Sequence, residues 1–250
     1  MPDHNILLFF AFFFIAFVYA SVGFGGGSSY LALLAFIGLS VTVIRPTALL
    51  CNIIVVSGGC YVFYKQGLLN FKKSLPLVIS SVPAAFIGGY LSLKQDVFFI
   101  VLGTSLLIAS LLLWFQERWQ SETDASKNTS AFASSGIGGA LGLLSGMVSI
   151  GGGIFLAPVL NLIKWDQPKS IAATSSFFIL VNSISGLAGF FTANNFQTDW
   201  SFTLPLMAAV FFGGQLGSRT GAIKFSQITV RKVTAVLILI AAVRLLKEYY

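Results

Sequence analysis

Two runs of three glycines, Gly25 to Gly27 and Gly151 to Gly153, are the parts of this sequence best suited to binding a ligand. Glycine permits positive φ angles and lets a ligand approach backbone N–H groups closely. Where such a run precedes a helix, the free N–H groups and the helix dipole favour an anion. Tight helix packing is the alternative, since small residues are common where membrane helices touch. A second copy at an equivalent position favours the anion loop.

Small polar side chains accompany both glycine runs. Some twenty residues after each run, a small-polar stretch ends in asparagine, at Asn52 and at Asn182. Together with the glycines Gly25, Gly26, Gly27, Gly151, Gly152 and Gly153, the candidate binding residues are Ser28, Thr47, Asn52, Ser149, Thr174, Ser175 and Asn182. Hydroxyls in membrane helices often bond their own helix carbonyls instead. The asparagines would be costly facing lipid, so they either contact substrate or tie broken helices together.

Arg45 is the cation best placed to bind an anion. It lies between two apolar runs and directly before Pro46, a residue that suits the first turn of a helix. A guanidinium can bind two oxygens of a sulfonate at once. A loop arginine at the lipid headgroups is the competing interpretation. In the second half, its counterpart is Lys169 or a neutral residue.

Residues for acid–base or metal chemistry are few. One His and two Cys argue against a multi-ligand metal site or a disulfide framework. We expect Cys51 and Cys60 to pack as small apolar side chains. All eight acidic residues fall in loops or at the ends of apolar runs. We therefore expect no enzymatic activity, no bound metal and no cofactor.

The composition indicates an integral membrane protein. Of the 250 residues only 9% are charged, against about 25% in soluble domains, and 56% are hydrophobic, with a mean hydropathy of +0.88. The net charge of +7 comes from basic residues in short gaps between apolar runs, so it reports topology and not nucleic-acid binding. The expected partners are the lipid bilayer and a small anionic substrate, and a homo-oligomer stays open.

The apolar runs predict an all-α, multi-pass protein with ten hydrophobic segments. Runs without charged residues cover 5–44, 46–64, 74–93, 97–116, 128–163, 170–198 and 200–218, and a last segment covers 229–246. A span needs about 20 apolar residues, so the first and fifth runs are long enough for two passes each. We expect the first segment to be retained, because Asp3 and His4 replace the basic start of a cleavable signal peptide.

The chain divides into two copies of about five segments each. Residues 1–115 form the first, 131–250 the second, and the polar linker 116–130 joins them. Besides the glycine runs, Asn52 pairs with Asn182 and Gly88-Gly89 with Gly213-Gly214. An odd number of segments per copy predicts an inverted repeat, the plan of many secondary transporters.

Loop charges predict the orientation of the chain. Eleven Lys and Arg residues fall on the linker's side of the membrane and four on the other, which predicts a cytoplasmic linker and both termini outside. The arm after the second glycine run, Ile154 to Ile163, has about 10 residues, enough to cross roughly half the hydrocarbon core. We therefore expect re-entrant or broken helices whose glycine-rich ends meet near the midplane.

Two glycine-rich runs, Ser21 to Tyr30 and Ser145 to Leu156, are each followed by a small-polar stretch that ends in asparagine. In these features the sequence resembles the TauE/SafE sulfite exporter family, over roughly Ile6 to Leu246. The resemblance implies a bacterial inner-membrane transporter whose substrate is a small sulfur oxyanion, such as sulfite or an organosulfonate, and which exports it. A polytopic membrane enzyme and a pore for small neutral solutes are the alternatives.

Overall fold

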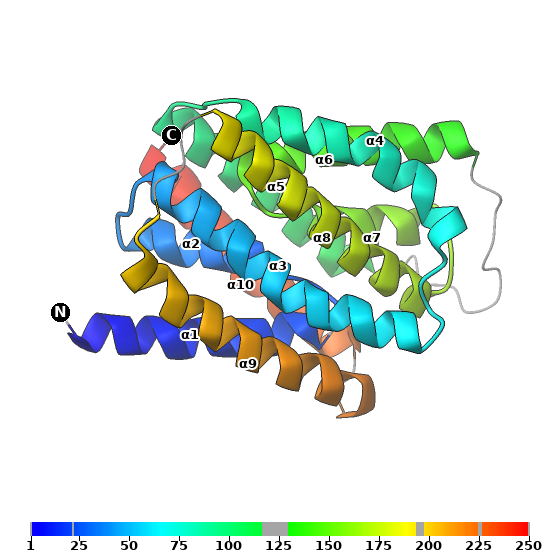
Figure 1. Cartoon of the computed structure of the whole chain (residues 1–250), viewed down its shortest axis with the longest axis horizontal. Coiled ribbons are helices and arrows are strands. Elements are labelled where there is room, and N and C mark those ends of the chain that lie inside the picture. Colours follow the sequence, from blue (N-terminus) through cyan, green and yellow to red (C-terminus); the bar gives the residue numbers. More distant parts are fainter. Residues whose placement is uncertain (1, 22, 117–129, 194–197, 225–226, 250) are drawn as a thin grey trace.

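The computed structural model describes residues 2–21, 23–116, 130–193, 198–224 and 227–249. All regular structure within these ranges is α-helical, as the sequence predicted. The ten helices described (Figure 1) are α1 (Pro2–Ala20), α2 (Gly27–Phe36), α3 (Val41–Lys65), α4 (Phe71–Tyr90), α5 (Gln95–Phe115), α6 (Ala131–Val148), α7 (Gly153–Leu162), α8 (Pro168–Thr192), α9 (Trp200–Lys224) and α10 (Gln227–Tyr249).

Four of these helices, α3, α5, α6 and α8, are long and apolar enough to cross a membrane by length and composition. Many of their large apolar side chains face outward, including Ile108, Trp114 and Ile184. Outward apolar side chains suit a lipid environment, in which burial in protein is not needed to remove them from water. The buried core and the outer face of the bundle are therefore both apolar, and they differ in how closely their side chains are packed by other protein atoms.

Two helices, α2 and α7, are short. Each has ten residues, so each is about 15 Å long and covers about half of a hydrocarbon core. Both begin directly after a left-handed glycine, Gly26 or Gly152, and both are followed within two residues by another positive φ, at Gly38 (73°) or Lys164 (51°). Left-handed residues interrupt a helix, so the backbone at both ends limits these two helices to about half a span.

The long helices pack in corresponding pairs. Helix α4 packs against α6, and α1 packs against α9. In each pair glycines let the backbones touch: an added Cβ at Gly142 or Gly146 would meet the backbone of Ser81 or Ala85 in α4, and one at Gly213 or Gly217 would meet the backbone of Phe13 or Phe17 in α1. Residue numbers rise together across both contacts, so the helices of each pair run parallel. Helix α5 also packs against α10 and α3 against α8, and α8 and α3 contact α4 and α9, respectively.

The chain runs end to end through this bundle. Helix α1 begins and α10 ends at the same end of the molecule, on the left in Figure 1, and α6 begins at the opposite end. Helices α1 and α6, each of which precedes a glycine run, therefore begin at opposite ends of the molecule.

Candidate functional site

The two glycine runs meet in the interior. We call Gly23–Gly27 tip 1 and Ser149–Gly153 tip 2. Each tip is held by a side chain from the other half of the chain: Asn52 Nδ2 of α3 donates to the carbonyl of Ile150 at 2.8 Å, and Ser176 Oγ of α8 donates to the carbonyl of Gly23 at 2.6 Å. Helices from both halves thus fix the position of both tips.

The two tips have similar backbone shapes. Positive φ angles occur at Gly23 (82°) and Gly26 (81°) in tip 1, and at the matching Ser149 (58°) and Gly152 (80°) in tip 2. Tip 2 has a further positive φ at Gly151 (85°), whereas the matching Gly25 has none. Gly26 and Gly152, the N-cap residues of α2 and α7, have no side chain that could accept a capping bond from the first N–H groups of these helices. The first N–H groups of a helix have no partner within it, so both tips carry the partial positive charge of a helix N-terminus.

Asn52 contacts both tips. Its side chain is fully buried and lies against Gly25 and Gly27, where an added Cβ at Gly25 would come within 2.5 Å of Asn52 Oδ1. That oxygen has no hydrogen-bond partner, although Nδ2 donates to tip 2. A buried unpaired amide oxygen is costly unless a ligand or water satisfies it. Asn52 therefore donates one bond to tip 2 and keeps an unpaired acceptor oxygen beside tip 1.

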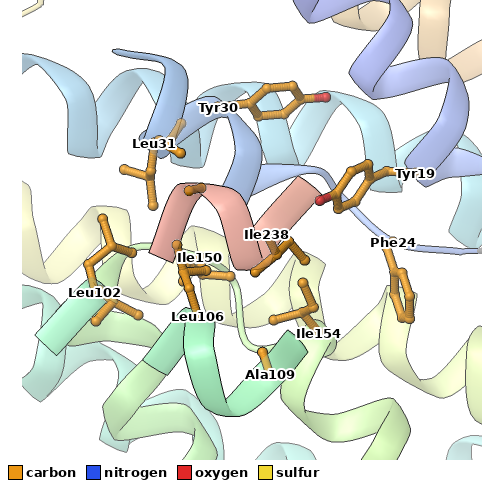
Figure 2. Packing of buried hydrophobic residues seen from close by; sticks show 14 of the residues in the cluster. Tyr19, Phe24, Tyr30, Leu31, Leu102, Leu106, Ala109, Ile150, Ile154 and Ile238 are labelled. Atoms are coloured by element: carbon orange, nitrogen blue, oxygen red, sulfur yellow. The ribbon is translucent and has the colours of Figure 1, made fainter. Parts of the chain in front are cut away.

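A small cavity separates the tips. It is lined by Tyr19, Phe24, Gly25, Gly26, Gly27, Ser28, Ile150, Ile154 and Ile179. Its volume is about 10 Å³, which holds about one water molecule. Figure 2 shows Tyr19 and Phe24 from the first half near Ile154, in the apolar cluster that also contains Leu106 of α5 and Ile238 of α10. The structure therefore has the tips closed on each other.

The pairing of Asn52 with Asn182 is wrong in register. Asn52 packs against the glycines of tip 1, and the side chain that packs in the same way against Gly151 and Gly153 of tip 2 is Ile179. Asn182 lies almost one turn further along α8, and its Nδ2 donates to the carbonyl of Phe178 in the same helix at 2.9 Å. The sequence pattern pairs Asn52 with Asn182 because both are asparagines. The residue that meets tip 2 is instead determined by which face of α8 lies against the tip. Asn182 is buried, as expected, with its own Oδ1 unpaired.

The paired threonines occupy equivalent positions. Thr47 Oγ1 lies 3.3 Å from Thr203 Oγ1 of α9, and Thr174 Oγ1 lies 3.1 Å from Ser74 Oγ of α4. Both are buried. Their hydroxyls thus tie long helices together, and neither lines the cavity.

The predicted serines have different surroundings. Ser28 lines the cavity, and its Oγ lies 3.4 Å from Tyr19 Oη, at the long end of hydrogen-bond distance. Ser175 Oγ is buried without a partner. Ser149 is part of tip 2, and its hydroxyl bonds to Arg45. Ser28 is therefore the predicted serine with direct access to the cavity.

Arg45 lies neither at a helix start nor in a loop. Helix α3 begins at Val41, so Arg45 is inside it and only 1% exposed. Its Nε donates to Ser149 Oγ at 2.9 Å, and its Nη atoms donate to the carbonyls of Gly146 (3.1 Å), Gly89 (3.4 Å) and Leu91 (3.4 Å). Those carbonyls belong to the C-terminal ends of α6 and α4, where the helix dipoles are negative. The guanidinium thus holds the base of tip 2, and its nitrogens face the protein and not the cavity.

The carboxylates that the structure describes lie away from the tips. Asp96, Asp199 and Glu248 are exposed, and Asp166 forms a half-buried ion pair with Lys73 at 2.8 Å. Lys73 also donates to the carbonyl of Trp165 and lies over its ring. A hydrogen bond from the Ser201 hydroxyl lowers the pKa of Asp199. Cys51 and Cys60 are buried free thiols.

Sequence reasoning missed several residues at the tips. Tyr19, Ile150, Ile154 and Ile179 line the cavity, and Ser176 holds tip 1. Buried unpaired hydroxyls also lie beside tip 2, at Ser145 and Ser183. Ser176 belongs to the small-polar stretch that begins at Thr174, so the sequence carried a signal for it. Aliphatic residues in an apolar helix carry no such signal.

Comparison with known proteins shows the family. The family model described as "Sulfite exporter TauE/SafE" matches residues 8–245. The chain is 32% identical to the "Probable membrane transporter protein y4hK" of Sinorhizobium fredii, over 98% of this chain and all of that protein. It is 26% identical to the "Probable membrane transporter protein YunE" of Bacillus subtilis, over 88% of this chain and 89% of that one. No solved structure matches. The chain therefore belongs to the TauE/SafE sulfite exporter family of membrane transporters.

Proposed function

We propose that this protein exports a small sulfur oxyanion, such as sulfite or an organosulfonate, across the bacterial inner membrane, and that the anion binds between tip 1 and tip 2. One observation carries the proposal: the N-termini of two half-length helices meet at one small buried cavity. Gly26, Gly27 and Ser28 at the start of α2 and Ile154 at the start of α7 line it, whereas Gly151, Gly152 and Gly153 do not. An anion there would gain from both helix dipoles and from the free N–H groups.

The inverted repeat and the broken helices are part of this proposal. Helices α1 to α5 and α6 to α10 follow a similar order of lengths, including the ten-residue α2 and α7, although α9 with 25 residues is longer than α4 with 20. The parallel pairs α1–α9 and α4–α6 and the antiparallel pair α5–α10 are those that two oppositely oriented copies require. With a cytoplasmic linker and both termini outside, α2 would lie in the outer half of the membrane and α7 in the inner half.

The nine cavity-lining residues favour binding over catalysis. Ser28 and Tyr19 supply the hydroxyls of this set, and the other lining side chains are apolar or absent. None of them ionises near neutral pH, whereas hydrolysis needs a positioned acid or base. We therefore propose transport and no enzymatic reaction.

Ligand-induced thermal stabilisation of the purified full chain tests the proposal. Sulfite or methanesulfonate is expected to raise the melting temperature, because a ligand that binds only the folded state stabilises it. Sodium chloride at equal ionic strength, glycerol and urea are the controls. Stabilisation by glycerol or urea, with none by the two anions, would replace the proposal with a neutral-solute pore.

We further expect that no protein carboxylate couples transport to protons. In proteoliposomes, Asp96→Asn, Asp166→Asn and Asp199→Asn should each keep the wild-type ratio of methanesulfonate flux with and without an imposed pH gradient. Asp199 stays ionised near neutral pH because its pKa is lowered, and Asp166 is engaged by Lys73. Loss of the pH-driven component alone, in any one variant, would contradict this expectation.

A further inference from the structure

We propose that the two tips bind different parts of the substrate: tip 1 takes the oxyanion, and the isoleucines around tip 2 take a short apolar substituent. The inference rests on the anion site proposed above and goes beyond it, because it assigns residues that determine specificity. It favours an organic anion with an alkyl group over a bare inorganic oxyanion.

The cavity lining is divided between the two halves of the chain. The first half supplies the backbone of Gly25 to Gly27 and the hydroxyls of Tyr19 and Ser28. The second half supplies three isoleucines, Ile150, Ile154 and Ile179. Phe24 is the one apolar side chain that the first half adds to this lining. One wall can therefore donate hydrogen bonds, and the opposite wall offers almost only apolar contact.

This division results from residue differences at equivalent positions. The residue directly after the third glycine is Ser28 in the first half and Ile154 in the second. The side chain that packs on the glycines is Asn52 in the first half and Ile179 in the second. A symmetric anion site would repeat the serine and the asparagine. Ser28, Ile154 and Ile179 line the cavity, whereas Asn52 packs on Gly25 and Gly27 outside this lining. The replacement of serine by isoleucine and the isoleucine from α8 make the lining amphipathic.

Unpaired polar atoms lie beside both tips, and the division concerns the side chains that line the cavity: Ser145 and Ser183 have unpaired hydroxyls beside tip 2 but do not line it. Asn52 Oδ1 is fully buried against Gly25 and Gly27, where it can accept a hydrogen bond but cannot donate one to an oxyanion. Ser28 Oγ has only a 3.4 Å contact with Tyr19 and can turn toward a ligand. Ile154 and Ile179 have no polar atom to offer, so an oxyanion oxygen on their side would lose its hydration without replacement.

An alkanesulfonate series tests the inference. Isothermal titration calorimetry on the purified full chain would compare sulfite with methane-, ethane- and propanesulfonate, and with 1-propanol. We expect affinity to rise about fourfold per added methylene, as for burial of one CH₂ group. We expect no binding of 1-propanol, which lacks the oxyanion. The series separates the charged end from the apolar end.

The matched variants Ile154→Ser and Ser28→Ile test which residue contacts the alkyl group of the ligand and which contacts its oxyanion. Ile154→Ser should reduce the chain-length dependence to less than about twofold per methylene, while Ile154→Val keeps it. Ser28→Ile should weaken sulfite and methanesulfonate by about tenfold, for a lost charge-assisted hydrogen bond, and keep the chain-length dependence.

Contrary results distinguish failure of the two-part site from failure of the proposed function. If sulfite and methanesulfonate bind but affinity is flat or falls with chain length, the inference is overturned and the anion site stands. If wild type binds none of the anions, the proposed function itself fails. An unchanged chain-length dependence in Ile154→Ser would show that the apolar end lies elsewhere.

Discussion

Replacing Gly26 or Gly152 with leucine is expected to abolish transport while the chain still inserts into the membrane. Both residues have φ near +80°, which a side chain tolerates poorly. An added Cβ would come within 2.8 Å of the Tyr30 ring at Gly26, and within 2.9 Å of Phe178 Cε1 at Gly152. The side chain would also occupy the space through which an anion reaches the backbone. Methanesulfonate flux in proteoliposomes, normalised to inserted protein, measures the effect.

Gly38→Leu is the matched control for this test. Gly38 has a similar φ of +73°, but an added Cβ there meets nothing within 4 Å. It carries the same backbone strain without blocking a tip, so it should keep most of the flux. Gly26→Ala and Gly152→Ala serve as milder variants if leucine prevents insertion. Wild-type flux in either correctly inserted leucine variant would exclude the tips as the binding site.

Arg45→Met is expected to lower both stability and transport. The substitution leaves the carbonyls at the ends of α4 and α6 without their donor and frees Ser149 at the base of tip 2. Loss of one hydrogen bond to a charged group costs about 1.5–3 kcal/mol, and four such bonds are lost together. Arg45→Lys should give an intermediate effect, since an ammonium cannot reproduce the planar fork. The apparent melting temperature and the methanesulfonate flux measure the two effects.

Arg244→Met provides the comparison. Arg244 is exposed and stacks on Phe36 at 4.3 Å, a contact that is worth about 0.5–1 kcal/mol at exposed sites. It should therefore change melting temperature and flux little. If Arg45→Met instead kept the wild-type melting temperature and lost only anion binding, the guanidinium would contact the substrate directly, and its role at tip 2 would be secondary.

The sequence by itself determined the class of the protein and the order of its parts. The low charge content requires a membrane environment, because so few polar side chains cannot solvate a surface of this size. The repeated glycines predicted where the two short helices begin, because glycine readily takes the left-handed conformation found at Gly26 and Gly152. The length of the arm before Lys164 predicted the ten-residue α7. These are local properties of the chain, so a linear pattern can report them.

The tertiary structure decided which side chains meet the tips. Asn52 and Ile179 occupy equivalent places because helix register sets which face of α3 or α8 meets the glycines, and a three-residue difference moved Asn182 out of that place. Arg45 satisfies helix ends that are 44 and more residues away along the chain, so no local pattern could reveal its partners. The isoleucine wall is likewise a result of packing, because an isoleucine in an apolar run has the same appearance whether it faces lipid, core or ligand.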